Sequence, residues 1–413
     1  MLFVANRLFH ADHTEHVSSS AIRIATAGVA VGILVMIVSI CVSCGFQREI
    51  KSKIASLAGH MQIVNVQSLY RSQTLPIQIT DSMSDEVSAI PHVKRVQRFV
   101  LCPGMLKTDH MFRGVVFRGV DSSFDASYMS SCLVSGSIPA FGGCEDTAVM
   151  DSILLSASVS SALGLHVGQK VYAYFFDEGL RVRRLVVSGI FRTHMSDIDE
   201  RMCYADARLT QKLAGFHADQ YSGAEIMADD YAQVDVVSTR LASIFAERED
   251  DYGQYYATPH VDELYPNLFS WLTLFDTNVG AILILMICVA VVTMISGLLV
   301  IILERTQFIG IMKSMGATNG LLRRIFLYFA SMVVWRGMLC GNVLALLLLW
   351  IQYNTGIVAL DPQSYYIAQV PVYFPWFDIV VVDVVMFFSC VLVLIIPTYV
   401  ISRIHPARSI AFE

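Results

Sequence analysis

Histidine and carboxylate side chains gather at two points of the chain where they could bind a metal ion. His10, His13 and His16 recur every three residues, which would place them on one face of a helix. A second group combines one histidine with three carboxylates: His194, Asp197, Asp199 and Glu200. Neither group has the tight spacing of known zinc motifs, so a polar turn and an exposed loop are the simpler interpretations. The sequence therefore predicts no metal ion and no cofactor in this chain.

The sequence also lacks the motifs that would make the chain an enzyme. A nucleophile elbow, a His-Glu-x-x-His pair and a Walker A loop are all missing. The stretch from Gly164 to Lys170 resembles a Walker A loop but has the wrong spacing and no hydroxyl. If the function uses ATP, a different subunit must bind the nucleotide.

Four cysteines fall in the polar central region: Cys102, Cys132, Cys144 and Cys203. An even number in an oxidising compartment permits disulfides, with three possible connectivities. Cys132 and Cys144 would close a short loop, but four buried free thiols explain the sequence equally well.

Three polar side chains lie inside long apolar runs, namely Arg336, Asn342 and Asp383. Because a charge in the bilayer costs at least about 2.5 kcal/mol, such residues usually face a partner or a cavity. We expect a contact between Arg336 and Asp383 that fixes helix packing or moves during function. The alternative is that each contacts water or backbone independently.

The elements that position these residues are four apolar runs, at about 21–44, 279–303, 325–351 and 379–402. Each reaches the roughly 20 residues that a membrane-spanning helix needs. The chain is 55% hydrophobic and only 15% charged, against about 25% charged in soluble domains. Its net charge of −6 gives no indication of nucleic-acid binding.

Loop charges predict the orientation of these spans. Basic residues concentrate in the loop between the second and third spans and in the tail: Arg305, Lys313, Arg323, Arg324, Arg403 and Arg408. The 352–378 loop has no Lys or Arg. By the positive-inside rule both termini are cytoplasmic and the central region is outside, in the periplasm of a Gram-negative cell.

The expected fold is a membrane protein with four transmembrane helices in a 1+3 order. A large periplasmic α+β domain is inserted between the first and second helices. The central region has strand patterns at about 62–67, 93–100, 113–120, 170–176 and 182–191, and helix patterns at 84–90, 152–163 and 230–244. The expected division is: 1–20 amphipathic lead-in, 21–45 first span, 46–275 periplasmic domain with helical stalks, 276–303 second span, 304–324 cytoplasmic helix, 325–352 third span, 353–377 periplasmic loop, 378–402 fourth span and 403–413 cytoplasmic tail.

The 304–324 loop predicts a short helix with a broad apolar side, formed by Phe308, Ile309, Ile311, Met312 and Met315. Charge comes from Glu304, Arg305 and Lys313, and Gly316 is well placed to end the helix. An exposed apolar helix between two spans needs a groove on a partner. The alternative is a helix lying in the headgroup layer.

Here the sequence resembles the type VII ABC permeases, the FtsX and MacB superfamily. The resemblance rests on these positions of the loop: Glu304, Arg305, Ile309, Gly310, Ile311, Met312, Lys313, Met315, Gly316 and Ala317. The tail from Pro397 to Arg408 also resembles the usual ending of the family. Stretches at 45–63, 163–191 and 361–372 resemble the lipoprotein-releasing (Lol) branch.

The resemblance implies that the 304–324 loop holds a coupling helix, which sits in a groove of a cytoplasmic ABC ATPase dimer that binds ATP and Mg. It implies a second permease, either the same or a paralogous chain. In the Lol branch, motion passed through the spans lifts lipoproteins from the inner membrane to a periplasmic carrier. The alternatives are a MacB-like exporter and an FtsX-like regulator of cell-wall hydrolases.

Two features of the spans could contact membrane lipid or a second permease. Ile33, Met36, Ile37 and Ile40 share one side of the first span and are candidates for lining a lipid cavity, with ordinary packing or lipid-facing surface as the alternative. Gly337 and Gly341 form a Gly-x-x-x-Gly pair that would suit a dimer interface.

Overall fold

The computed structural model describes residues 16–71, 74–142, 151–176, 179–361 and 365–398. The chain divides into two compact units. We call Met1–Arg48, Ser270–Ala359 and Gln369–Glu413 the membrane unit, and Glu49–Phe269 with Leu360–Ala368 the core unit. Each is described by itself.

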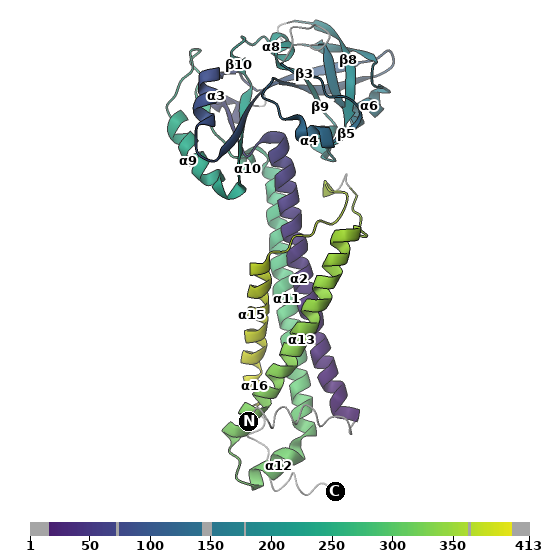
Figure 1. The fold of residues 1–413 in the computed structure, drawn as a ribbon, viewed down its shortest axis with the longest axis vertical. Helices are drawn as coiled ribbons and strands as arrows, with labels where there is room; N and C mark the ends of the chain where they lie inside the picture. The colour runs from purple at the N-terminus through teal and green to yellow at the C-terminus, as the bar shows by residue number, and fades with distance from the viewer. Residues whose placement is uncertain (1–15, 72–73, 143–150, 177–178, 362–364, 399–413) are drawn as a thin grey trace. The chain divides into compact units, whose positions relative to one another are not determined.

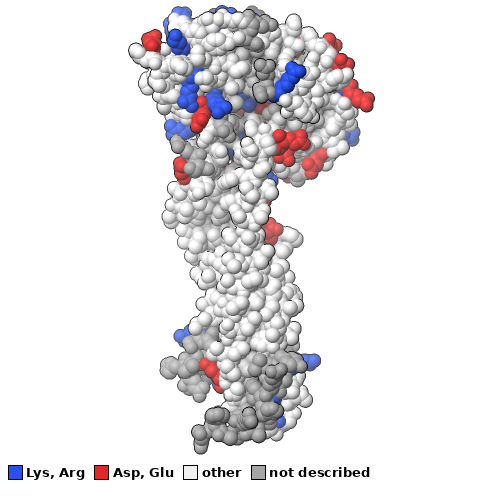
Figure 2. Space-filling view, turned by 180° about the vertical axis from the view of Figure 1, so that it is seen from behind, with Lys and Arg blue, Asp and Glu red and all other residues white. Residues whose placement is uncertain are grey.

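The long helices of the membrane unit are α2 (His16–Ala58), α11 (Pro266–Glu304), α13 (Asn319–Thr355) and α15 (Trp376–Val393). Short helices α12 (Thr306–Ser314) and α16 (Ile395–Thr398) accompany them (Figure 1). Among the described residues, four helices are long and apolar enough to cross a membrane: Ile22–Ala58, Pro266–Glu304, Asn319–Thr355 and Trp376–Thr398. Figure 2 shows a face on which charged side chains are scarce along these helices.

Helix α2 is the central helix of the membrane unit. Its most apolar stretch is 61% buried, against 22%, 39% and 22% for the other three candidate spans. Ile33, Met36 and Ile37 are fully buried in a core shared with the other long helices, and Ile40 is buried as well. These four residues therefore pack within this chain, and their place in a lipid cavity stays a prediction.

The glycine pair of α13 serves the same packing. A Cβ at Gly337 would lie 2.9 Å from the Thr26 carbonyl oxygen, and one at Gly341 would lie 2.6 Å from that of Ala30. Both carbonyls belong to α2, so the pair permits a close α2–α13 crossing inside one chain. The dimer interface expected at these glycines is corrected accordingly, because α2 already occupies their face.

The core unit holds a ten-stranded sheet in the order β12-β1-β11-β3-β4-β9-β6-β8-β5, with β7 pairing β3 and β8. The strands are β1 (Met61–Asn65), β3 (Val93–Lys107), β4 (Phe112–Val120), β5 (Leu133–Gly136), β6 (Ser152–Ser156), β7 (Lys170–Phe175), β8 (Arg181–Phe191), β9 (Met202–Asp206), β11 (Gly223–Ala228) and β12 (Tyr256–Ala257). Strands β2 (Ile77–Gln78) and β10 (Gln220–Tyr221) form a small second sheet. The helices are α3 (Asp81–Ser88), α4 (Ala126–Ser131), α6 (Ala157–Leu163), α7 (Ser196–Asp199), α8 (Ala207–Ala214), α9 (Val234–Phe245) and α10 (Val261–Leu264).

Strand β3 joins two lobes, each with its own apolar core. Its first half pairs with β11 and its last residues pair with β7. One core contains Ile226 and Leu241, and the other contains Phe117 and Leu155. A single long strand thus runs through both lobes.

A buried ion pair lies where the lobes meet. Arg118 of β4 pairs with Glu225 of β11, and both side chains are less than 10% exposed. The Gln62 side-chain amide donates a further hydrogen bond to Glu225 at 3.3 Å. The Arg118 guanidinium also lies over the Phe99 and Tyr204 rings. The pair links the strands across β3, because β3 lies between β4 and β11 in the sheet.

Most predicted elements of this unit lie close to observed ones, but the 152–163 helix is corrected. Its first part is strand β6, and helix α6 begins only at Ala157. Ile153, Leu154 and Leu155 are fully buried between β8 and β9. Ser156 then starts the helix by accepting a hydrogen bond from Val159 N.

Among the described residues, Cys102, Cys132 and Cys203 form no disulfide with one another. Cys144, like His10 and His13, lies outside the described residues. The predicted Cys132–Cys144 pairing therefore lies outside the described residues.

His60 gives the core unit a predicted dependence on pH. Its Nδ1 accepts a hydrogen bond from Ala228 N at 3.1 Å, which requires the unprotonated nitrogen. Burial lowers the pKa of His60. A lowered folded-state pKa means that this stabilisation is complete above about pH 6.5 and is lost as the pH falls through the folded value.

In the parent protein the free energy of unfolding should fall as the pH is lowered from 7.5 to 5. We expect His60→Asn to make this fall less steep by up to about 1.4 kcal/mol per pH unit, which is the limit for one proton. Thermal unfolding of the full chain in detergent measures this. The control is His166→Asn, because His166 is exposed and this variant should show the same dependence of stability on pH as the parent protein. If stability depended on pH equally in both variants, His60 would not be the source of the pH dependence.

Candidate functional site

The first candidate site is α12 with the residues that flank it. Gly316 has φ +90°, a conformation that favours glycine, and follows directly after the last turn. Gly316 N donates to Lys313 O, and Ala317 N donates to Met312 O, both at 3.0 Å. Thr318 then caps α13 by accepting from Leu321 N. The predicted helix and its glycine stop both match the structure.

The apolar residues of α12 divide between two directions. Ile309 is fully buried and packs into the core of the membrane unit. Ile311 is 48% exposed and Met315 is 78% exposed. Phe308 and Met312 are half-buried. One side of α12 is therefore fixed to its own chain, and the other side leaves two large apolar side chains uncovered.

The charged residues predicted for this site lie around the same segment. Glu304 ends α11 and is exposed, while Arg305 and Lys313 are half-buried. Burial lowers the pKa of Lys313. The arrangement combines an exposed apolar surface with basic groups beside it, which suits docking to a protein groove.

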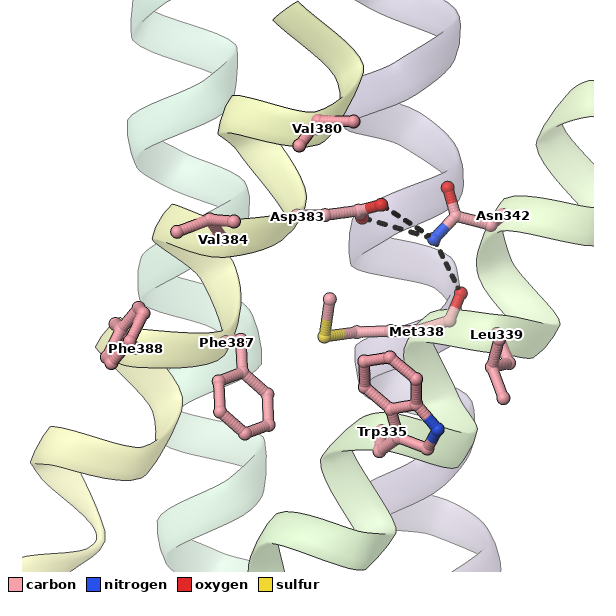
Figure 3. Close-up of a pocket in the computed structure, with 9 residues that line it drawn as sticks. All are labelled: Trp335, Met338, Leu339, Asn342, Val380, Asp383, Val384, Phe387 and Phe388. Atoms are coloured by element: carbon pink, nitrogen blue, oxygen red, sulfur yellow. Dashed lines mark hydrogen bonds between the residues drawn. The ribbon is translucent and has the colours of Figure 1, made fainter. Parts of the chain in front are cut away.

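The second candidate site lies between α13 and α15. Asn342 Nδ2 donates to both carboxylate oxygens of Asp383 at 3.1 Å and to Met338 O at 3.0 Å (Figure 3). The structure thus gives Asp383 a different partner from Arg336, the one expected from sequence. Arg336 lies six residues before Asn342, so the two side chains leave the helix about 120° apart.

A pocket of about 280 Å³ surrounds the Asn342–Asp383 pair. Figure 3 labels its nine lining residues, and apart from these two the only polar group among them is the indole N–H of Trp335. Trp335 and Phe388 are 56% and 65% exposed, so the pocket opens at the surface of the membrane unit. The sequence analysis singled out Asn342 and Asp383 but did not pair them, and it did not find the pocket, which depends on how α13 and α15 meet.

The histidine and carboxylate group of the core unit has a structural role at Asp199. This buried carboxylate accepts hydrogen bonds from Thr193 N, Thr193 Oγ1 and His194 N at 2.8–3.2 Å. It holds a turn in which His194 has φ +63°. Among the described residues, no group of three or more His, Cys, Asp and Glu could hold a metal ion.

The described residues combine membrane-length helices, a partly uncovered helix between two of them and a two-lobed α/β unit, an arrangement that suits a membrane permease. The family description "MacB-like periplasmic core domain" matches residues 24–244, and "FtsX-like permease C-terminal" matches residues 280–406. The chain belongs to this family of ABC transporter permeases. The resemblance predicted from the sequence is confirmed.

Curated relatives match along almost the whole chain. The lipoprotein-releasing system transmembrane protein LolC of Xylella fastidiosa (strain 9a5c) is 23% identical over 401 residues, covering 94% of this chain and 92% of that protein. The corresponding protein LolE of Haemophilus influenzae is 20% identical over 400 residues, covering 94% and 93%. Among solved structures, the periplasmic region of MacB from Actinobacillus actinomycetemcomitans is 15% identical, with a TM-score of 0.34, covering 50% of this chain and 91% of that one.

Proposed function

We propose that this chain is the permease subunit of an ABC complex that extracts lipoproteins from the inner membrane and passes them to a periplasmic carrier. The observation that carries the proposal is the match to relatives named as LolC and LolE over 94% of the chain. Burial of acyl chains is worth about 0.8 kcal/mol per CH₂, so lifting several chains out of a bilayer needs an energy source.

ATP binding by a separate cytoplasmic ATPase dimer supplies that energy in the proposal. The chain has no Walker A loop, so ATP and Mg belong to the partner. The uncovered residues Ile311 of α12 and Met315, just after its last turn, are the contact proposed for the ATPase groove. Movement of α12 passes to α11 and α13, because Ile309 packs into the same core as these helices.

The membrane arrangement that suits this mechanism has both termini in the cytoplasm, one span before the core domain and three after it. It rests on the basic residues of the 304–324 loop and the tail, and on their absence from 352–378. The core domain is then periplasmic, where it meets the carrier. A second permease, the same chain or a paralogue, completes the complex.

The test is to deplete this protein and to quantify lipoproteins in separated inner and outer membranes. We expect many outer-membrane lipoproteins to remain in the inner membrane. Re-expression of the parent chain should restore sorting, and re-expression of a chain with Ile311→Asp should not. Normal sorting after depletion, with no second permease present, would overturn the proposal in favour of export or regulation of cell-wall hydrolases.

A further inference from the structure

The polar end of the pocket between α13 and α15 offers hydrogen-bond acceptors and no remaining donor. Both hydrogens of Asn342 Nδ2 are used, one by Met338 O and one by the Asp383 carboxylate. Within the described part of the chain, Asp383 accepts from this single nitrogen, and nothing donates to Asn342 Oδ1. An ionised carboxylate has about four acceptor positions, so most of its capacity is unfilled. The polar end therefore suits a ligand that brings N–H or O–H groups, and a positive charge suits it best.

Most of the pocket extends from this polar pair in one direction along the helices, and Val380 lies on the other side, toward Trp376 (Figure 3). Asp383 lies seven residues after Trp376, about 10 Å along α15. Phe387 and Phe388 lie one turn further from Trp376 (Figure 3). On α13, Trp335 lies seven residues before Asn342, again about 10 Å in that same direction. The pocket is thus polar toward the Trp376 end and apolar beyond it.

This polarity matches that of a lipid in one leaflet. Trp376 and Phe377 are 63% and 80% exposed at the start of α15, as expected for side chains at the membrane–water interface. A lipid entering from that leaflet directs its head toward Trp376 and its acyl chain toward Phe388. The carboxylate lies below the interface, and a buried membrane charge draws headgroups and water toward itself by local thinning of the bilayer.

We propose that this pocket binds one membrane lipid whose head carries a primary ammonium group, as in phosphatidylethanolamine. The ammonium offers three N–H donors to Asp383 and Asn342, and the acyl chain packs between Trp335 and Phe388. A choline head has a charge but no N–H donor. A glycerol head has donors, but the net negative charge of its lipid is repelled by Asp383.

The experiment compares phosphatidylethanolamine with phosphatidylcholine of identical acyl chains, added to the purified full chain in detergent. Native mass spectrometry measures how much of each lipid is retained. One hydrogen bond to a charged group is enough for a preference of about tenfold for the ethanolamine lipid. We expect Asp383→Asn to reduce this preference to near parity, and Val384→Trp, which fills the pocket, to lower retention of both lipids.

Asp378→Asn is the matched control, because Asp378 is exposed on the same helix and does not line the pocket. It should keep the preference of the parent chain. Equal retention of the two lipids by the parent chain, or an unchanged preference in Asp383→Asn, would overturn the proposal. Displacement of the bound lipid by an equimolar diacylated lipopeptide with a free amino terminus would also overturn it, since the pocket would then hold substrate. The measurement uses neither ATPase nor transport, so its failure is distinguishable from a failure of the proposed function.

Discussion

Ile311→Asp is expected to weaken binding of the ATPase to this permease by about 30-fold or more, while the permease itself still folds. Ile311 is 48% exposed on α12, so a charge there enters no packed interior of this chain. In the complex the introduced carboxylate would be buried in an apolar groove without a partner of opposite charge. Loss of a central apolar contact in an interface typically costs about 2–4 kcal/mol, which corresponds to this change in affinity.

Titration of the ATPase against the purified permease in detergent measures the affinity, and ATP hydrolysis in the reconstituted complex measures the coupling. Asn319→Asp is the matched control. It adds the same charge to the same loop, but at the first turn of α13, where a negative charge is favoured by the helix dipole. If Ile311→Asp binds the ATPase as well as the control does, α12 is not the coupling element.

Helix α12 could be predicted from sequence because the residues that determine it are local. The glycine at 316, the helical spacing of the apolar residues and the charged ends all fall within about twenty residues. The sequence alone could not show which apolar residues of α12 face the rest of the chain and which are exposed. Ile309 faces inward only because α12 is held between α11 and α13, whose packing depends on the whole membrane unit.

The polar residues of the spans illustrate the same limit. A charged pair in two apolar helices suggests a contact, but helix rotation decides which residue reaches across. Asn342 has the rotation that faces α15, and it is Asn342 that reaches Asp383. Periodicity in one helix cannot supply the rotation of its neighbour.

Strand β7 was predicted from sequence because its residues alternate between buried and more exposed positions. Strand β11 was missed because five of its six residues are buried, so its sequence has no alternation of apolar and polar residues. It even contains Glu225, which is buried only because Arg118 lies two strands away to pair with it. A lone acidic residue in a short apolar run predicts a loop unless that partner is known.

Gly341→Leu is expected to prevent stable folding of the membrane unit, at a cost of about 3 kcal/mol or more from overpacking. A Cβ at this position would lie 2.6 Å from the Ala30 carbonyl oxygen and 3.0 Å from Ile33 Cβ. Neither atom can move easily, because one is helix backbone and the other belongs to a fully buried side chain. The helices α2 and α13 would have to separate, which opens the core around α2.

Thermal unfolding followed by fluorescence size-exclusion in detergent measures the effect as a lower Tm or a loss of monodisperse protein. Gly280→Ala is the control, since nothing lies within 4 Å of a Cβ there. Because alanine favours helix over glycine by about 1 kcal/mol, the control should match or exceed the parent chain in stability. Gly341→Ala should fall between the two, since it adds only the clashing Cβ. If Gly341→Leu instead kept the parent Tm but dissociated a dimer, the glycine pair would face a second permease after all, and the tight α2–α13 crossing would be wrong.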